Sequence, residues 1–364
     1  MRAGRLLHAR GAGQDARPLD DTGHSAPAER EPWLDAVRGL AVLLVVGHHA
    51  FPNAGTLEAV AAPWRTGGWV GVELFFALSG YLLGRGLLHE LRLGAGLQVG
   101  RFYARRAWRI LPPFLALCAF TLAVRAGLGM PLPWPRVAGE LLMLQNHLGR
   151  LWLHTWSLAV EWHAYLVLPW LFLLGGRARG WLLLAVAVAS PLLRAWVWAP
   201  VPGGDPLPMG TPFRLDSISL GALAAVVEGR LAAVPRGRRA LALPALALLL
   251  PLFLVPLGTA TWLPWLGPLM AGGAGVLLVV AAPVAPVPSG LGWLAAVGRR
   301  SYSLYLWHVP VWGWGQLALT RRGVGLGSEG LFLVLWAVSI AAGWFAAFAV
   351  ESRTQRWRVR FHGE

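Results

Sequence analysis

The chain has 364 residues, of which 56% are apolar and only 13% are charged. Its mean hydropathy of +0.54 excludes an ordinary soluble domain with a polar surface. The net charge of +15 comes from Arg residues in short tracts between apolar runs, which argues against a nucleic acid and for a lipid bilayer as the partner.

The two ends of the chain differ from its apolar body. Residues 1–31 are polar, mixed in charge and rich in Gly, Ala and Pro, and they contain no apolar core long enough for a signal peptide. We therefore expect a disordered cytoplasmic tail over 1–31, a transmembrane domain over 32–352 and a basic cytoplasmic tail over 353–364.

The apolar body divides into runs of the length that a membrane helix needs, about 20 residues. Ten such runs lie at 34–53, 68–88, 107–127, 153–174, 179–199, 212–229, 239–257, 262–282, 301–319 and 330–350. The predicted fold class is all-α, a polytopic membrane helical bundle of about ten transmembrane helices. A cytoplasmic N-terminus puts most of the Arg residues inside, so we expect both termini in the cytoplasm. Every one of the 32 basic residues is Arg, which indicates the codon usage of a GC-rich bacterium, so we expect a bacterial cytoplasmic (inner) membrane.

The first run carries Arg38 and His49, eleven residues apart. On a helix this spacing puts both on one face, about 16 Å apart, whereas His48 points about 100° away. A histidine is well suited to accept a hydroxyl proton near neutral pH. Alternatively, Arg38 snorkels to the interface and His49 caps the outer end of the helix.

The second and third runs carry further ionisable groups. Glu73 is the only acid in an aromatic, apolar stretch, and it is either an interfacial carboxylate or a partner of a histidine. The Arg residues at 101, 105, 106 and 109 form a cationic stripe that suits a donor bearing phosphates, unless it is a plain positive-inside anchor. Pro112 and Pro113 are expected to break or kink this helix.

Three later runs repeat polar residues at helical spacing. In the fourth, His154, Ser157, Glu161 and Tyr165 form a stripe, read either as part of a site or as a hydrogen-bond ladder between helices. In the sixth, Arg214 and Asp216 are too close in sequence to share a face, so each is expected to pair with another helix. In the ninth, Ser301, Tyr305 and His308 recur. With one cysteine and scattered acids, we expect no metal site.

Six segments, taken in order, resemble the acyltransferase 3 family of bacterial membrane acyltransferases. They are LDAVRGLAVLLVVGHH, GVELFFALSGYLL, FYARRAWRILPP, HTWSLAVEWHAYL, FRLDSISLGALA and GRRSYSLYLWHVPV, followed by VES near the last run. The resemblance covers about 34–353. His163 departs from it, because the family more often has Gln there, and the chain shows no appended hydrolase-like domain after the last run.

The resemblance implies a ten-helix fold that takes an acyl group from acyl-coenzyme A at the cytoplasmic side to an acceptor at the outer face. Arg38 and His49 correspond to the family's paired arginine and histidine, and Arg106 with Arg109 to its arginine pair. The predicted catalytic residues are His49, Arg38, Glu73 and Glu161; the donor-binding residues are Arg105, Arg106 and Arg109; the remaining pocket residues are Ser157, Tyr165, Arg214, Asp216, Tyr305 and His308.

The predicted activity is O-acyl transfer, with an acetyl group as the favoured cargo, acyl-coenzyme A as a co-substrate rather than a bound cofactor, and a carbohydrate hydroxyl of the cell envelope as the acceptor. His49 is expected to deprotonate the hydroxyl or to relay the acyl group, with Arg38 and Glu73 setting its charge state. The alternatives are a proton-coupled transporter or flippase and an inactive scaffold. The sequence does not specify the acceptor or the oligomeric state.

Overall fold

The computed structural model describes residues 31–49, 55–94, 96–197, 208–231, 238–281, 289–324 and 328–351, together with residues 287 and 353. The two predicted tails lie outside these residues, apart from Glu31 and Arg353. The part of the chain that begins at Pro32 is described here by itself. Within the described ranges it is all helical, which confirms the predicted fold class.

Each of the ten predicted runs contains a helix. In chain order these helices are α1 (Pro32–His49), α3 (Val70–Arg92), α4 (Val99–Gly127), α7 (Trp156–Leu173), α8 (Gly176–Val197), α9 (Asp216–Leu231), α10 (Ala242–Leu254), α11 (Leu263–Ala281), α13 (Ser301–Arg321) and α14 (Ser328–Ala346). Among the described residues, five helical stretches are long and apolar enough to cross a membrane: α3, α4, α8, α11 and residues 329–350 of α14 and the turn after it. In α1, α7 and α13 the polar residues of the predicted site lower the mean hydropathy.

Short helices between the long ones were not predicted, because they fall below the length of a hydrophobic run. They are α2 (Glu58–Gly67), α5 (Trp134–Leu141), α6 (Gln145–Leu148) and α12 (Gly292–Gly298), with the 3-10 turns η2 (Leu153–Thr155) and η3 (Thr211–Phe213). The α5, α6 and η2 segments link α4 to α7. They therefore set where α7 begins.

Of the two expected effects of Pro112 and Pro113, a break does not occur, because α4 runs without interruption through both prolines. Proline removes a backbone N–H and so leaves a helix carbonyl without its usual partner. Close to the prolines, the Tyr302 hydroxyl of α13 donates a hydrogen bond of 2.8 Å to the Ile110 carbonyl. The N–H groups that the prolines remove would have paired with the carbonyls of residues 108 and 109, so this bond ties α13 to α4 next to the weakened turn and does not replace the lost donors.

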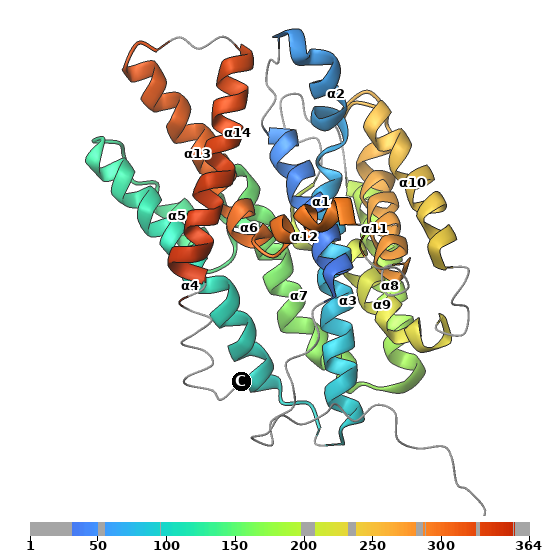
Figure 1. The fold of residues 1–364 in the computed structure, drawn as a ribbon. Helices are drawn as coiled ribbons and strands as arrows, with labels where there is room; N and C mark the ends of the chain where they lie inside the picture. Colours follow the sequence, from blue (N-terminus) through green and yellow to red (C-terminus); the bar gives the residue numbers. More distant parts are fainter. Residues whose placement is uncertain are drawn as a thin grey trace, which may run out of the picture. The chain divides into compact units, whose positions relative to one another are not determined.

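Backbone-to-backbone contacts bring α3 against α9 and α1 against α12. A Cβ atom added at Gly80 would lie 2.0 Å from the Ile218 carbonyl oxygen, and one at Gly221 would lie 1.9 Å from the Ala77 carbonyl oxygen. Small residues allow helices to approach this closely in a bilayer. In Figure 1, α13 and α14 lie side by side, α10 and α11 form another neighbouring pair, and α1 and α3 run between them.

Candidate active site

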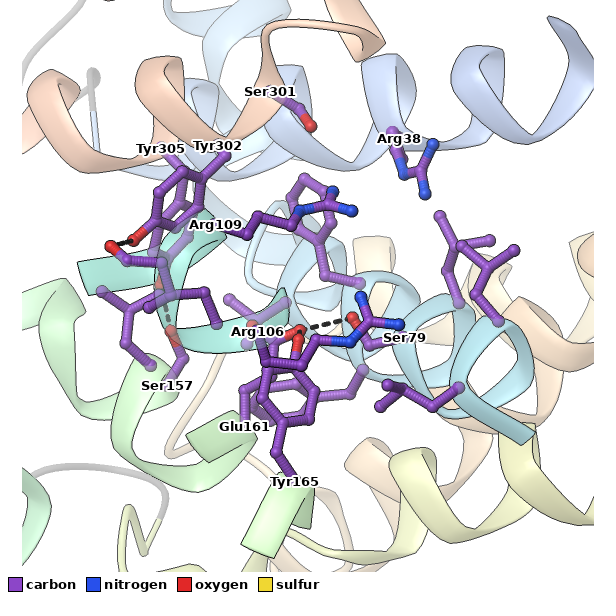
Figure 2. Close-up of a pocket in the computed structure, with 18 residues that line it drawn as sticks. Arg38, Ser79, Arg106, Arg109, Ser157, Glu161, Tyr165, Ser301, Tyr302 and Tyr305 are labelled. Atoms are coloured by element: carbon purple, nitrogen blue, oxygen red, sulfur yellow. Dashed lines mark hydrogen bonds between the residues drawn. The ribbon is translucent and has the colours of Figure 1, made fainter. Parts of the chain in front are cut away.

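A partly open cavity of about 90 Å³ lies among α1, α3, α4, α7 and α13. Its walls combine apolar side chains with a few polar ones, and Figure 2 shows the polar groups pointing into the shared space. The polar lining residues are Arg38, Ser79, Arg106, Arg109, Ser157, Glu161, Tyr165, Ser301, Tyr302 and Tyr305.

Three guanidinium groups, from Arg38, Arg106 and Arg109, line this cavity. Arg38 of α1 forms an ion pair of 2.7 Å with Asp35 one turn earlier. The Arg106 guanidinium carbon lies 5.7 Å from the centre of the Tyr165 ring, and its buried Nε has no hydrogen-bond partner among the described residues. Positive charge held against aromatic rings suits the binding of phosphate groups.

The Glu161 carboxylate faces the same space from α7. Its Oε1 accepts a hydrogen bond of 2.6 Å from the Ser79 hydroxyl and another from the Tyr165 hydroxyl. These donors come from α3 and from the next turn of α7, so the carboxylate is held in place from two sides. The predicted polar stripe of α7 therefore faces the interior of the bundle.

Ser157 and Tyr305 form a hydroxyl pair at the other side of the cavity from Arg38 (Figure 2). Their oxygens lie 2.6 Å apart, and the Tyr305 hydroxyl donates a hydrogen bond of 2.9 Å to the His154 carbonyl. The pair joins α7 to α13. Through the His154 carbonyl it also links the cavity wall to a cluster of histidines.

The histidine cluster consists of His49, His154 and His308, from α1, η2 and α13. The ring centroids of His49 and His308 are 5.1 Å apart, and those of His154 and His308 are 4.9 Å apart. Nε2 of His308 lies 3.4 Å from Nδ1 of His49. His154 and His308 are fully buried, whereas His49 is half-buried. Three imidazole rings from distant parts of the chain thus meet next to Tyr305.

Backbone carbonyls fix the tautomers of all three rings, with the hydrogen on Nδ1 in His49 and His308 and on Nε2 in His154. Only a protonated nitrogen can donate to a carbonyl, so Nδ1 of His49 carries the hydrogen that points at Val45 O, 2.9 Å away. Nδ1 of His308 likewise donates to Tyr305 O over 2.6 Å. When these two rings are neutral, Nε2 is then the nitrogen with the free lone pair. Nε2 of His49 has the lone pair required of a general base.

A buried carboxyl group on α5 holds the turn that carries His154. Oε1 of Glu140 accepts hydrogen bonds of 2.8 Å from Leu151 N and from Thr155 Oγ1, and Gln145 Nε2 donates to Thr155 O over 2.9 Å. Burial raises the pKa of Glu140 to about 7. This short segment, outside the long helices, therefore fixes one wall of the histidine cluster.

Glu73 does not contact His49, which corrects the prediction that it sets the charge of that ring. The Glu73 carboxylate forms an ion pair with Arg214 and accepts a hydrogen bond of 2.5 Å from Ser217 Oγ. Arg214 also stacks on Trp156, with 4.7 Å from the guanidinium carbon to the ring centroid. Glu73 thus joins α3 to the start of α9.

A second buried ion pair lies next to the first. Arg194 of α8 binds Asp216 over 2.6 Å and donates to the Trp265 carbonyl over 2.9 Å. The prediction that Arg214 and Asp216 pair with different helices is confirmed. All four charged side chains are at most 1% exposed and tie α3, α8, α9 and α11 together. Removing one member would leave a buried charge uncompensated, so we assign the cluster a structural role.

Two further predicted positions lie outside the cavity. Arg105 forms an ion pair with Glu90 of α3 and is not among the residues that line the cavity, unlike its neighbour Arg106. Nδ1 of His163 lies 2.6 Å from Thr211 Oγ1, and its ring lies beside His147. On a helix, a residue two positions from Glu161 lies about 160° away around the axis, so His163 faces away from the cavity.

Arg38 and His49 lie toward opposite ends of α1. Eleven helical residues separate them by about 16 Å along the axis, so Arg38 does not touch His49. Arg38 lines the cavity beside Arg109, whereas His49 contacts His308. Arg38 and His49 are therefore two separate groups at opposite ends of α1, one in the cavity and one in the histidine cluster.

Sequence reasoning missed several contributors. Ser79 lines the cavity and binds Glu161, and Tyr302 lines it and binds α4. Both lie in segments already singled out. Tyr302, three residues before Tyr305, shares a helix face with a predicted residue, whereas Ser79 is six residues, or about 240°, from Glu73 and had no such signal. Glu140 and Arg194 had no such signal either, because their partners lie far away in the sequence.

Within the described ranges, no group of three or more His, Cys, Asp or Glu residues is arranged to hold a metal ion.

These features define a multi-pass membrane protein with a cation-lined cavity whose lining residue Tyr305 contacts a buried imidazole cluster, an arrangement suited to group transfer. The chain belongs to the acyltransferase 3 family of membrane O-acyltransferases, because the family model described as an acyltransferase domain matches residues 31–351. This membership confirms the resemblance and places the chain among enzymes rather than transporters.

Similar proteins include the peptidoglycan O-acetyltransferase OatA of Listeria monocytogenes, 28% identical over 316 residues, which cover 77% of this chain and 49% of the relative. The O-acetyltransferase OatA of Staphylococcus aureus is 26% identical over 313 residues, which cover 77% of this chain and 50% of the relative. The chain thus spans about half the length of these relatives. No solved structure matches it.

Proposed function

We propose that the protein transfers an acetyl group from acetyl-coenzyme A to a hydroxyl group of a cell-envelope carbohydrate. The observation that carries this proposal is a cavity that is lined by three guanidinium groups and extends to the hydroxyl pair of Ser157 and Tyr305. The Tyr305 ring packs on His308, which in turn contacts His49. A donor with a phosphate-rich head and a long thioester arm matches such a route. The acetyl cargo and the carbohydrate acceptor are supported by the names of the relatives.

The donor's phosphates would bind Arg38, Arg106 and Arg109 at the cytoplasmic face. This placement follows from the positive-inside rule, because the start of α4 carries four Arg residues within nine positions. In this orientation both termini are cytoplasmic, the membrane is the bacterial cytoplasmic membrane, and His49 lies nearer the outer face. The thioester arm would run past Glu161 toward the hydroxyl pair of Ser157 and Tyr305.

His49 would take the proton of the acceptor hydroxyl at Nε2. The hydroxyl oxygen then forms a bond to the thioester carbonyl carbon, the bond from that carbon to sulfur breaks, and the thiolate leaves with the proton returned by His49. The Ser157 hydroxyl could donate to the carbonyl oxygen as it gains charge by turning from the Tyr305 oxygen, whereas the Tyr305 hydroxyl is donated to the His154 carbonyl. Transfer through an acyl group held on Nε2 of His49 uses the same residues and remains a second route.

The test reconstitutes the full chain in proteoliposomes with acetyl-coenzyme A labelled in the acetyl group and with soluble peptidoglycan fragments or other envelope glycans. Wild type is expected to label a glycan, and His49→Gln to lose at least about 10²-fold in rate, the usual contribution of a general base. The matched control is His48→Gln, because His48 is the neighbouring residue but binds the Arg65 carbonyl over 2.7 Å.

A chain that labels none of these acceptors contradicts the proposed activity. Equal labelling by wild type and His49→Gln contradicts the assigned base while leaving the activity in place. A loss in His48→Gln as large as that in His49→Gln indicates damage to the helix end rather than loss of a catalytic group.

A further inference from the structure

His308 contacts the predicted base at Nδ1, the ring nitrogen that does not take the acceptor proton in the proposed reaction. Its Nε2 lies 3.4 Å from Nδ1 of His49, and its own Nδ1 is tied to Tyr305 O over 2.6 Å. The His308 ring is completely buried and is held by α13. Its Nε2 is therefore a fixed lone pair directed at the Nδ1 hydrogen of His49.

The Nδ1 hydrogen of His49 is shared between two acceptors. It points to Val45 O at 2.9 Å, within its own helix, and to Nε2 of His308 at 3.4 Å. The second distance is long for a hydrogen bond in the resting protein, and catalytic hydrogen bonds often shorten once substrate is bound. Of the two acceptors, only the imidazole can take the proton.

The surroundings of the two rings contain no stronger base. Within the described ranges, no ion pair or hydrogen bond joins a carboxylate to His49, His154 or His308. The carboxylate of Glu73, the predicted partner of His49, is taken by Arg214. His154 donates Nε2–H to Leu306 O, and its ring packs on His308 without a hydrogen bond to it among these residues.

We infer that His308 is the proton partner of His49, so that two protons move when the acceptor is activated. This inference rests on the proposed function. The hydroxyl proton goes to Nε2 of His49, and the Nδ1 proton of His49 goes to Nε2 of His308. The charge then lies on His308, whose Nδ1–H stays bound to Tyr305 O, while His49 becomes the neutral Nε2–H tautomer. When the thiolate leaves, both protons return along the same path.

This arrangement differs from a histidine held by a carboxylate, because the partner is neutral before the reaction and cationic during it. A carboxylate partner only stabilises the imidazolium that forms. Here the positive charge moves one ring further from the acceptor and the thioester. His308 is a positioning residue and proton acceptor that acts through His49, since it does not line the cavity.

The experiment measures acetyl transfer to soluble peptidoglycan fragments by the reconstituted full chain in mixtures of H2O and D2O. A plot of rate against deuterium fraction is curved when two protons move in the rate-limiting step and straight when one moves. We expect a curved plot for wild type and a straight plot for His308→Gln, with kcat reduced about 10²-fold and KM for acetyl-coenzyme A unchanged within about twofold. Glutamine offers an acceptor oxygen but cannot take the proton.

The matched control is His48→Gln. The His48 ring centroid lies 5.2 Å from that of His49, close to the 5.1 Å of His308, but its Nδ1 binds the Arg65 carbonyl. This variant is expected to keep the curved plot. A straight plot for wild type, or a curved plot for His308→Gln, overturns the inference while leaving the transferase activity established.

A second measurement needs neither activity nor a known acceptor. Solid-state NMR of the reconstituted chain with 15N-labelled histidine reports which ring nitrogen carries hydrogen, and the signals are assigned by their loss in His49→Gln and His308→Gln. We expect hydrogen on Nδ1 and a bare Nε2 in both rings. Hydrogen on Nε2 of His49 overturns the inference, because that tautomer has no Nδ1 proton to pass on.

Discussion

Replacing Arg106 with Gln tests whether the guanidinium groups of the cavity hold the donor. Arg106 is packed between the rings of Phe102 and Tyr165, at 5.6 and 5.7 Å from the guanidinium carbon. Its buried Nε has no hydrogen-bond partner among the described residues, so its N–H is free to bind a phosphate of the acyl donor. Its neighbour Arg105 lies one position away but is engaged by Glu90 and does not line the cavity.

The size of the effect follows from the bond that is lost. A hydrogen bond to a charged group contributes about 1.5–3 kcal/mol, which corresponds to about a 10- to 100-fold weaker Kd. We expect Arg106→Gln to weaken coenzyme A binding by this amount, and Arg106→Lys to fall between it and wild type, because Lys keeps the charge but not the planar fork. For Arg105→Gln we expect a change below about threefold, since Arg105 is paired with Glu90 and does not line the cavity.

The assay is isothermal titration of the reconstituted variants with coenzyme A, which has the phosphates but no acyl group. Equal losses for Arg105→Gln and Arg106→Gln would refute the assignment, because a general electrostatic attraction to the Arg stripe does not distinguish the two positions. Unchanged binding in Arg106→Gln would show that the donor enters elsewhere.

Three other predictions concern stability. Glu73→Gln leaves Arg214 buried and unpaired, so it is expected to destabilise the chain by about 3–5 kcal/mol, and the double variant with Arg214→Met by less; thermal unfolding in detergent measures both, and an additive loss contradicts a direct pair. Burial raises the pKa of Glu140 from 4.5 to about 7, so the stability it contributes is complete below about pH 4.5 and is lost as pH rises through 7. Wild type should therefore lose more Tm between pH 5.5 and 8 than Glu140→Gln, and parallel curves would refute this. Gly80→Leu should prevent folding, because its Cβ alone would meet the Ile218 carbonyl at 2.0 Å; a normal yield of folded protein would contradict the contact between α3 and α9.

Helical periodicity was sufficient to predict which side chains share one face of a helix and which of two nearby residues points toward a given neighbour. It separated His49 from His48, and the structure turns these rings to different partners, His308 and the Arg65 carbonyl. It also indicated that Arg214 and Asp216 pair with separate helices, as they do. In each case the physical cause is local, because one residue step on a helix turns a side chain by about 100°.

The sequence could not predict ion-pair and hydrogen-bond partners that come from distant segments. Glu73 was expected near a histidine, yet the guanidinium that reaches it comes from residue 214, and periodicity within α3 contains no information about that distance. Arg105 fits the four-residue spacing of the Arg stripe, but it forms an ion pair with Glu90 at the end of α3 and lies outside the cavity. Glu140 lies in a helix of eight residues, too short to stand out as a hydrophobic run, although it holds the turn of His154.

The central claim is that one cavity leads the donor from the guanidinium groups to His49. The most direct measurement is a structure of the reconstituted chain with a thioether analogue of acetyl-coenzyme A, which cannot release its acyl group. We predict that its phosphates contact Arg106 and Arg109 and that its acyl end lies between the hydroxyls of Ser157 and Tyr305 and Nε2 of His49. An analogue bound outside this cavity, or bound in it with the acyl end turned away from His49, would contradict the account.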